Sequence, residues 1–361
     1  MKKTILSAFV ILCMGMLVYA QVEPLPNDAQ TAQQINAYKF NANDLFTLFN
    51  APTNFVVDVQ DDLLYKGTEV RQVHPQGAQL LTDDHNQEWV FLYAGIKRGL
   101  PVYRIMNYGF RRFLTAGAGD GAFVTTESFR MVNQGSPDAQ LWFIIPTSND
   151  SHILYIKSTV SGVYLQAPDN TTAEFERYRC KTLSAVTQQN DKKKFVLQTS
   201  IIKLKLNRTK LSVSGVDVNI SIRPRYSENI FINIPGSNLA NGANLLSLRQ
   251  SPFDTYNIKE TSSGVSLYRI SVQDRREKCF MRYRSTLNPE HDGIILWECD
   301  EAHRIDQEWY IIPSIREQDT YIIINKNTGQ ALTAKDRETA NGTLLIMVDF
   351  QDGENQRWVI K

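Results

Sequence analysis

Four short stretches of the chain share one arrangement of polar and apolar positions. In each, a glutamine and one variable residue precede a tryptophan, and an apolar run such as Val90-Phe91-Leu92 follows it. Runs of β-branched and aromatic residues are typical of buried strands, and polar residues before them are typical of turns. Each stretch is therefore predicted to be a turn that leads into a strand. The four tryptophans are Trp89, Trp142, Trp309 and Trp358.

The aromatic positions recur at a nearly constant interval. Trp89 and Trp142 are 53 residues apart, a further 53 residues leads to Phe195, and 53 residues before Trp309 stands Tyr256. Such a period indicates supersecondary units that must share a core, because a single unit cannot bury its own apolar face. With Trp358 as the last, there are six such positions, and the third and fourth are separated by a longer gap of 61 residues. Two domains of three repeats each are predicted.

Short apolar runs, such as residues 102–105 and 153–156, alternate with turns rich in glycine and aspartate. Many short strands separated by turns are typical of an all-β domain. The second half of the chain also repeats the first, since residues 140–146 resemble residues 307–313. The chain is therefore predicted to be all-β and duplicated, with its halves joined near residue 200.

The N-terminal residues 1–20 combine two lysines, an apolar run and a small residue before the junction, which is the layout of a cleaved secretory signal. The apolar run is shorter than the roughly 20 residues that a spanning helix needs, so no membrane span is expected. Cys13 follows the bulky Leu12, so a lipid anchor is not expected either. The product is expected to be secreted, or to reach the periplasm or the cell surface.

The predicted division of the chain is a signal peptide at 1–20, an N-terminal arm or linker at 21–52, and two domains at 53–199 and 200–361. Residues 37–49 of the arm are compatible with a short helix. Residues 200–235 leave two alternatives. Either residues 201–206 and 211–213 open the second domain, or they form an inserted hairpin and residues 231–233 resume the repeat pattern.

The balance of charge argues against a nucleic-acid partner. Removal of the first 20 residues leaves 37 basic residues against 38 acidic ones. Binding to phosphate backbones needs a concentrated positive surface. The basic residues between positions 203 and 210 alternate in part with apolar ones, which favours a solvated strand face.

These motifs together resemble those of the ricin B-type lectins. The most specific match is Cys279-Phe280, followed by Ile294-Ile295-Leu296-Trp297-Glu298-Cys299 and by Asp306-Gln307-Glu308-Trp309. The resemblance covers about residues 53–361, although Phe195 and Tyr256 replace tryptophan in two repeats. It implies two tandem β-trefoil domains with internal threefold pseudo-symmetry, each built from a six-stranded barrel and a cap of three hairpins.

The four cysteines raise the question of pairing. Cys279 and Cys299 stand 20 residues apart in a chain expected to be exported, and the resemblance also pairs them, so a disulfide is predicted. Cys180 is then left over. It is buried, free or paired between chains, and a buried, inert thiol is favoured.

The resemblance gives the Gln-x-Trp motif structural roles first. The indole fills the core, and the glutamine amide satisfies backbone groups in a buried turn, which would cost about 1–3 kcal/mol each if left unpaired. The motif therefore indicates fold before function. The predicted structural residues are Trp89, Trp142, Trp309, Trp358, Cys279 and Cys299.

Sugar binding in the lectins that this chain resembles needs three further groups. They are a carboxylate on the second strand of the repeat, an aromatic platform for the apolar sugar face, and an asparagine before the motif glutamine. Repeat one has Val73 at the platform position, so His74 or Tyr65 must substitute for an aromatic there. The polar partners in repeat one are Asp58, Asn86 and Gln87.

Repeat five has the opposite defect, because Trp297, Asp306 and Gln307 are present but Met281 occupies the carboxylate position. Repeat three offers Tyr178 as an aromatic and has lost the closing motif. No repeat keeps all three groups, so galactose specificity is not implied. Glycan binding at repeat one or repeat five is the predicted function, and glycans or glycoconjugates are the predicted partners.

Motifs of catalysis are missing from the sequence. The five histidines form no His-x-x-x-His pair, and neither a Gly-x-Ser-x-Gly elbow nor a glycine-rich phosphate loop occurs. Asp83-Asp84-His85 and Glu290-His291-Asp292 are interpreted as solvated turns rather than metal sites. No enzymatic activity, cofactor or metal is expected. The alternative function is a trefoil scaffold that has lost its sugar sites and binds a protein, for example at a cell surface.

Overall fold

A computed structural model gives the fold. It describes residues 40, 45–50, 56–59, 68–73, 86–109, 112–118, 122, 124–127, 137–146, 153–160, 164–166, 178–179, 181–183, 195–199, 220–249, 255–262, 267–273, 275–284, 292–314, 317, 319–337, 342–351 and 353–361. Several sequence predictions lie outside these residues: the signal at 1–20, the substitutes Tyr65 and His74, the buried, inert thiol favoured for Cys180, the strands expected at 201–213, and the turns at 83–85 and 290–291.

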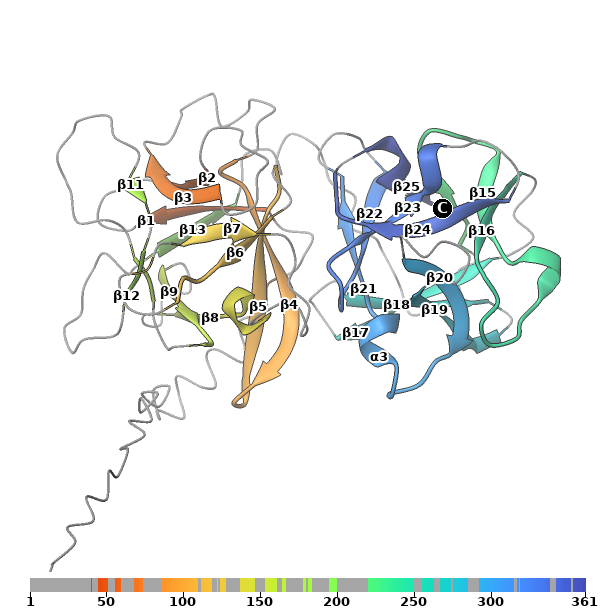
Figure 1. The fold of residues 1–361 in the computed structure, drawn as a ribbon, viewed down its shortest axis with the longest axis horizontal. Helices are drawn as coiled ribbons and strands as arrows, with labels where there is room; N and C mark the ends of the chain where they lie inside the picture. The colour runs from red at the N-terminus through yellow and green to blue at the C-terminus, as the bar shows by residue number, and fades with distance from the viewer. Residues whose placement is uncertain are drawn as a thin grey trace, which may run out of the picture.

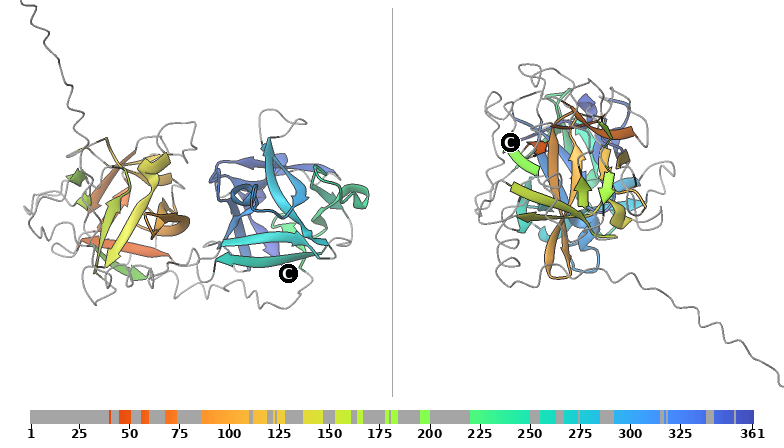
Figure 2. Two further views of the ribbon diagram at one scale, coloured as in Figure 1. Left: turned by 90° about the horizontal axis from the view of Figure 1, so that it is seen from below. Right: turned by 90° about the vertical axis from the view of Figure 1, so that its left-hand side faces the viewer.

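The chain forms two β-rich lobes, shown side by side in Figure 1 and from two further directions in Figure 2. The strands of the N-terminal lobe are β1 (Phe46–Asn50), β2 (Val56–Val59), β3 (Thr68–Val73), β4 (Trp89–Lys97), β5 (Leu100–Asn107), β6 (Arg112–Thr115), β7 (Thr125–Glu127), β8 (Trp142–Pro146), β9 (Ile153–Ser158), β10 (Tyr164–Gln166), β11 (Tyr178–Arg179), β12 (Lys181–Leu183) and β13 (Phe195–Thr199), with a short 3-10 helix, η2 (Pro137–Gln140), before β8.

The N-terminal lobe is a closed barrel with a cap. Antiparallel pairing runs from β1 to β4, β5, β8, β9, β13 and back to β1, so six strands close the barrel. The hairpins β2–β3, β6–β7 and β10–β12 form the cap. Each repeat therefore contributes two barrel strands and one hairpin. Closure leaves no free sheet edge in the barrel.

The C-terminal lobe repeats this plan. Its elements are β14 (Ile222–Pro224), β15 (Ile230–Asn233), η4 (Pro235–Ser237), β16 (Leu246–Arg249), β17 (Tyr256–Ser262), β18 (Leu267–Val272), β19 (Arg275–Arg284), β20 (Asp292–Glu298), α3 (Arg304–Gln307), β21 (Trp309–Pro313), β22 (Thr320–Asn325), β23 (Ala331–Ala334), η5 (Lys335–Arg337), β24 (Thr343–Val348), η6 (Glu354–Gln356) and β25 (Trp358–Ile360).

Its barrel closes through β14, β17, β18, β21, β22 and β25, with a single bridge between Ile220 and Tyr256 joining the first pair. The hairpins β15–β16, β19–β20 and β23–β24 form its cap. The predicted architecture of two tandem β-trefoils is thereby confirmed.

The six periodic aromatic residues occupy one position in this architecture. Each is the first residue of the last barrel strand of its repeat, at the starts of β4, β8, β13, β17, β21 and β25. The four tryptophans and Tyr256 are at most 1% exposed. Each lobe has its own apolar core around these side chains. The period of the sequence therefore marks the turns that feed the barrels.

A third apolar cluster lies between the lobes. It contains Val90, Leu92 and Met106 from the N-terminal lobe, and Ile312 and Ile324 from the C-terminal lobe. Tyr108 and Phe350 also meet edge to face across the seam, with ring centroids 6.3 Å apart. Buried apolar area of this kind is the dominant favourable contribution to association. The two trefoils therefore pack as one unit.

The structure corrects the prediction at the start of the first domain. Residues 46–50, which were compatible with a helix and were assigned to the arm, form β1 and pair along their whole length with β13. Phe40 is also buried in the core of the lobe. Local periodicity over so few residues does not separate helix from strand, and the pairing that closes the barrel decides.

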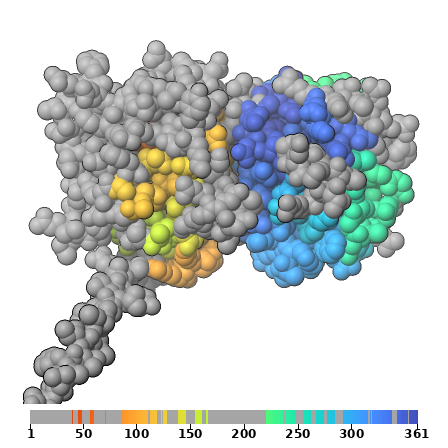
Figure 3. Space-filling view, in the orientation of Figure 1, coloured from red at the N-terminus to blue at the C-terminus, as the bar shows by residue number. Residues whose placement is uncertain are grey.

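The start of the second lobe is described from residue 220 onward. Its first described strand, β14, begins at residue 222, and residues 231–233 lie in β15, the first strand of its first hairpin, where one of the two alternatives resumed the repeat pattern. In the space-filling view of Figure 3, most of the described surface on this face belongs to the C-terminal lobe, coloured from green to blue.

Within the described part of the chain, no helix is long and apolar enough to span a membrane.

Candidate functional site

The tryptophans bind the backbone of the hairpin cap. Each indole Nε1–H donates to the carbonyl that immediately precedes the carboxylate position of its repeat. The bonds are Trp89 to Val57 at 3.1 Å, Trp142 to Leu114 at 2.9 Å, Trp309 to Phe280 at 3.2 Å and Trp358 to Leu332 at 2.9 Å. In repeat four the hydroxyl of Tyr256 donates to Ile232 in the same way. These side chains are therefore scaffold, and none of them faces a ligand.

The motif glutamines are also structural. The Gln140 and Gln356 amides donate to the hydroxyls of Thr115 and Thr333, and the Gln87 amide donates to Oδ2 of Asp58 at 2.9 Å. All of these glutamines are at most 3% exposed. Each one joins the barrel turn to the second strand of its repeat. The sequence placed Gln87 among the sugar ligands, and the structure buries its side chain against Asp58.

The strand register identifies the platform position in every repeat. In repeat five the platform residue Trp297 pairs with Cys279, which lies two residues before Met281 at the carboxylate position. In repeat one the residue two before Asp58 is Val56, and it pairs with Val73. By this rule the six platform residues are Val73, Glu127, Leu183, Leu248, Trp297 and Val348. Trp297 is therefore the one aromatic residue at a platform position.

Tyr178 does not lie at the platform position of repeat three. Strand β11 pairs with β3 of repeat one, with Tyr178 opposite Gln72, whereas β10 pairs with β12 and places Leu183 at the platform. The sequence interpretation offered Tyr178 as the aromatic of repeat three from its place along the chain alone. Register depends on which strands pair, and a single misassigned strand moves every position in the hairpin.

Repeat one presents little accessible chemistry in the described residues. Asp58 is 5% exposed and its Oδ2 accepts from Gln87. Asn86 is partly exposed, and its backbone carbonyl accepts from the Asn107 side chain at 2.8 Å. The platform position of this repeat carries Val73, opposite Val56, so the described residues place no aromatic ring at that position.

Repeat five presents a partly exposed aromatic platform, Trp297, near the end of β20. Met281, at the carboxylate position of β19, is 6% exposed and offers no hydroxyl acceptor of the strength of a carboxylate. With no polar side chain at this position, the Gln307 amide donates to a backbone carbonyl, that of Glu298, at 2.6 Å, as Gln356 also does to Asp349 in repeat six. Gln307 is fully buried and is scaffold, like Gln87.

Asp306 takes the place of the motif asparagine and lies in a polar cluster. Its Oδ1 accepts from Asn327 at 2.9 Å and from Arg282 at 3.4 Å. The Arg282 guanidinium also donates two bonds to Oδ2 of Asp292, at 2.8 and 2.6 Å. The Asp306 side chain remains 23% exposed. A carboxylate held in this way is positioned before any ligand arrives.

A histidine lies next to the platform. The ring centroids of Trp297 and His303 are 5.6 Å apart with the planes inclined at 60°. His303 Nδ1 is 2.9 and 3.0 Å from the two carboxylate oxygens of Asp300, and the backbone N–H of His303 also donates to Asp300. The hydrogen bonds from His303 hold the pKa of the Asp300 carboxyl below its ordinary value.

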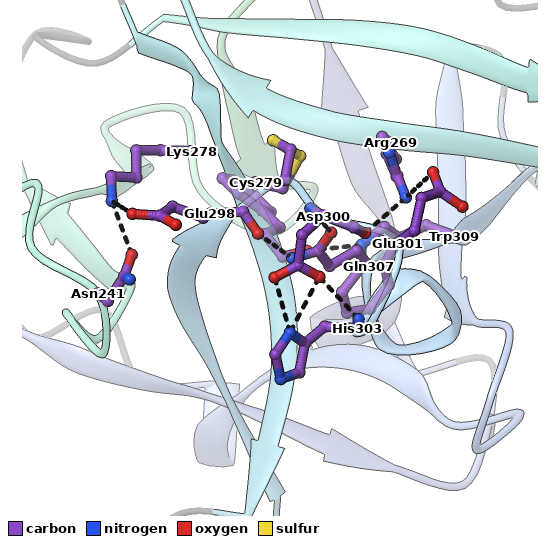
Figure 4. The surroundings of a disulfide bond; sticks show 12 residues. Asn241, Arg269, Lys278, Cys279, Glu298, Asp300, Glu301, His303, Gln307 and Trp309 are labelled. Atoms are coloured by element: carbon purple, nitrogen blue, oxygen red, sulfur yellow. Dashed lines mark hydrogen bonds and ion pairs between the residues drawn. A yellow bond between two sulfur atoms is a disulfide. The ribbon is translucent and has the colours of Figure 1, made fainter.

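The loop that carries Asp300 and His303 is held by a disulfide and by a hydrogen bond. The Cys279–Cys299 disulfide, predicted from the sequence, joins β19 to the residue after β20. The backbone N–H of Asp300 donates to Gln307 Oε1 at 3.2 Å. Figure 4 shows Asp300 between the His303 ring and Gln307, with Lys278 and Asn241 on the other side of the disulfide.

Sequence reasoning missed two sets of buried polar residues. Asn107 and Asn325 lie at the ends of β5 and β22, where their side-chain amides donate to the carbonyls of the preceding Gln-x-Trp turns. Glu308, fully buried, pairs with Arg304 at 2.7 Å and with Lys326 at 2.6 Å. Burial alone would raise the pKa of Glu308, but the two cations outweigh it and lower this pKa.

The Glu308 group also reaches the other lobe. The ammonium of Lys326 lies 6.0 Å from the ring centroid of Tyr93, and the hydroxyl of Tyr310 donates to the Tyr93 carbonyl. Burial, as the largest cause, raises the pKa of Tyr310. No local pattern in the sequence signals these contacts, because they join strands more than 200 residues apart.

Comparison with known proteins finds one family model that matches the C-terminal part of the chain. Residues 305–361 match the family described as ricin-type beta-trefoil lectin domain-like. The resemblance stated from the sequence is thereby confirmed for this part of the chain. No curated protein sequence matches the chain.

Solved structures similar to this chain include a mosquitocidal holotoxin, with 19% identity and a TM-score of 0.39 over 88% of this chain and 34% of that one. The haemolytic lectin CEL-III shares 14% identity, with a TM-score of 0.33 over 89% of this chain and 64% of its own. The Rhizoctonia solani agglutinin shares 16% identity, with a TM-score of 0.33 over 44% of this chain and 95% of its own. This chain thus spans about a third of the holotoxin and less than two thirds of the haemolytic lectin.

Proposed function

We propose that this chain is an exported, non-catalytic carbohydrate-binding protein, and that its principal glycan site is the hairpin cap of repeat five. The partly exposed indole of Trp297 carries this proposal. The C–H face of a sugar ring packs on an aromatic ring, whereas its hydroxyls need directional polar partners. Such a partner lies beside Trp297, since the His303 ring centroid is 5.6 Å from that of the indole, and the α3 helix that follows carries the partly exposed Asp306.

Repeat one is the weaker candidate. Asp58 offers a carboxylate at the expected position, but it is nearly buried, and the platform position of this repeat carries Val73. Among the described residues, no aromatic side chain stands at this platform position for a sugar to stack on. We therefore rank repeat five above repeat one, and expect repeat one to add little to the affinity.

The carboxylates of repeat five support binding rather than glycoside hydrolysis. Hydrolysis needs two carboxyl groups on opposite sides of the scissile bond. Here Asp292 and Asp306 both contact one side chain, Arg282, and Asp300 contacts His303. The described carboxylates are thus held by basic side chains, an arrangement that suits the positioning of acceptors for a ligand.

Export is supported by the sequence of residues 1–20 and by the disulfide, because disulfides persist in oxidising compartments. N-terminal sequencing of the protein from a secreting host tests this. A mature chain that begins at Gln21 is expected, and a chain that retains residues 1–20 in the extracellular fraction contradicts the proposal.

The binding proposal is tested on a printed array of neutral and acidic oligosaccharides. The wild type is expected to bind at least one oligosaccharide, and Trp297→Ala is expected to abolish that signal while its circular dichroism stays unchanged. Ile96→Ala, which removes a 60% exposed apolar side chain from the β4–β5 hairpin, is the matched control and keeps the signal. A wild type that binds nothing, or a Trp297→Ala variant that binds normally, refutes the proposal.

A second candidate function is binding to a protein partner through a trefoil surface that has lost its sugar sites. The residues at the sugar positions of repeat six favour it, since Thr333 and Val348 provide neither an acid nor a ring. Under this function, capture of a cell-surface protein by the immobilised chain persists after enzymatic removal of its glycans. Capture that disappears with the glycans favours the lectin function.

A further inference from the structure

The glycan site of repeat five lacks the usual acceptor for sugar hydroxyls. Met281 stands where the second strand would carry a carboxylate, and its side chain is buried. A vicinal pair of hydroxyls needs an acceptor close to the platform, because each hydroxyl that loses water must regain a partner. Another residue near Trp297 has to provide this acceptor if the site binds a sugar.

The nearest ring to Trp297 in the described residues belongs to His303, with 5.6 Å between the centroids. Its Nδ1 lies within hydrogen-bonding distance of both oxygens of Asp300. An ionised carboxylate only accepts, so Nδ1 must carry the hydrogen and the neutral ring keeps its lone pair on Nε2. Figure 4 shows the second ring nitrogen turned away from the carboxylate, and the side chain is 42% exposed.

We propose that His303 Nε2 is the hydroxyl acceptor of this glycan site, in place of the absent strand carboxylate, and that Asp300 is the positioning residue that fixes its tautomer. The inference rests on the proposed glycan binding at Trp297. The aromatic ring and the acceptor then come from one hairpin and the loop that follows it. The disulfide and Gln307 hold this loop in place.

Protonation of the His303 ring would remove the acceptor. When an imidazole takes up a proton, Nε2 becomes a donor and loses its lone pair, so a glycan bound through this atom is expected to bind the protonated ring more weakly than the neutral one. Among the charged groups of this region, Asp300 faces the ring directly, Glu298 lies at the end of β20, and Glu301 is bonded to Arg269 of β18 and to Arg304 of α3.

The variants are measured by biolayer interferometry with the array oligosaccharide that gives the strongest wild-type signal. His303→Ala is expected to bind about three- to tenfold more weakly, the effect of one neutral hydrogen bond. His303→Gln keeps an uncharged acceptor and is expected to stay within about threefold of the wild type, with an affinity that no longer changes with pH. Gln351→Ala is the control. The backbone N–H of Gln351 bonds Gln356 in repeat six as that of Asp300 bonds Gln307 in repeat five, so this substitution changes the equivalent turn of another repeat and is expected to leave the affinity unchanged.

Asp300→Asn separates positioning from a general structural role. Asparagine keeps an oxygen that can accept from the His303 backbone N–H and removes the carboxylate that holds the ring. The substitution is expected to weaken binding in the wild-type background and to have no further effect in His303→Ala, because the lost carboxylate acts on the glycan through the ring. An equal loss in both backgrounds would make Asp300 a structural residue and would overturn its assigned role.

The two proposals fail in different ways. Loss of binding in Trp297→Ala together with normal binding and pH dependence in His303→Ala overturns the acceptor and leaves the lectin function intact. A wild-type affinity that is constant or rises toward acid pH also overturns the acceptor. A wild type without any array signal refutes both.

Discussion

Replacing both Cys279 and Cys299 with alanine tests the link between the disulfide and the stability of the C-terminal lobe. The bridge joins residues separated by 20 positions. Closing a loop of that length removes conformational entropy from the unfolded chain equivalent to about 3 kcal/mol at 25 °C. The double variant is therefore expected to lose about 3 kcal/mol of unfolding free energy. Alanine is preferred to serine because Cys279 is fully buried, and a hydroxyl there would add a separate cost.

The assay is differential scanning calorimetry in the presence and absence of reductant. For a domain of about 150–250 residues, 1 kcal/mol corresponds to about 2–4 °C, so the transition of the C-terminal lobe is expected to fall by about 6–12 °C. Reductant should lower the wild-type transition by a similar amount and should leave the variant unchanged. This comparison separates the bridge from the lost packing of two sulfur atoms.

Two results would refute the reasoning. A variant that melts within about 2 °C of the wild type would mean that the loop is already constrained in the unfolded chain. A variant that still responds to reductant would mean that another thiol pair carries the effect. A corollary concerns binding, because the bridge fastens the loop of Asp300 and His303: the variant is expected to bind its glycan more weakly even well below its melting temperature.

Three further changes test the buried polar groups. Glu308→Gln leaves Lys326 without its carboxylate and is expected to lower the unfolding free energy, measured in urea, by about 3–5 kcal/mol. Because the folded-state pKa of Glu308 is lowered, its stabilising contribution is present above the unfolded-state pKa and is lost as pH falls through the folded-state pKa. The stability of the variant should therefore decline less steeply toward acid pH, and an unchanged decline would contradict the assignment. Tyr310→Phe removes the hydroxyl bond to Tyr93 across the lobes and is expected to cost about 1 kcal/mol, measured in the same way, whereas no loss would show that the bond is not formed. Asn325→Ala removes the amide that bonds the Asp306 carbonyl and is expected to cost about 1–3 kcal/mol, and a cost near zero would show that water replaces it.

The candidate site was only partly accessible from the sequence. Trp297 was found because its motif places an aromatic residue at a fixed distance from Cys299, and the register confirms that it stands at the platform position. His303 was not found. Its significance depends on a ring contact and on a hydrogen bond to Asp300 within an irregular loop, and neither leaves a periodic signal. Tyr178 was misplaced because distance along the chain does not reveal which strands pair.

The sequence by itself determined the repeating unit and the fold. A turn, an aromatic residue and an apolar run recur at a constant interval because every repeat must fill the same place in a barrel, so local pattern and global architecture agree. The disulfide followed from two cysteines in a chain that we expected to be exported and from the family that the motifs resemble. Local, periodic constraints of this kind can be recognised from the sequence alone.

Only the tertiary structure decided how the units close and meet. The pairing of β1 with β13 converts an ambiguous segment into a strand, and the contacts of Glu308, Lys326 and Tyr310 with Tyr93 join the lobes. These features depend on residues far apart in sequence, whose mutual geometry is fixed only when the chain has folded. The physical reason is that hydrogen bonds and ion pairs act over a few ångströms in space, while periodicity in a sequence reports only on neighbours along the backbone.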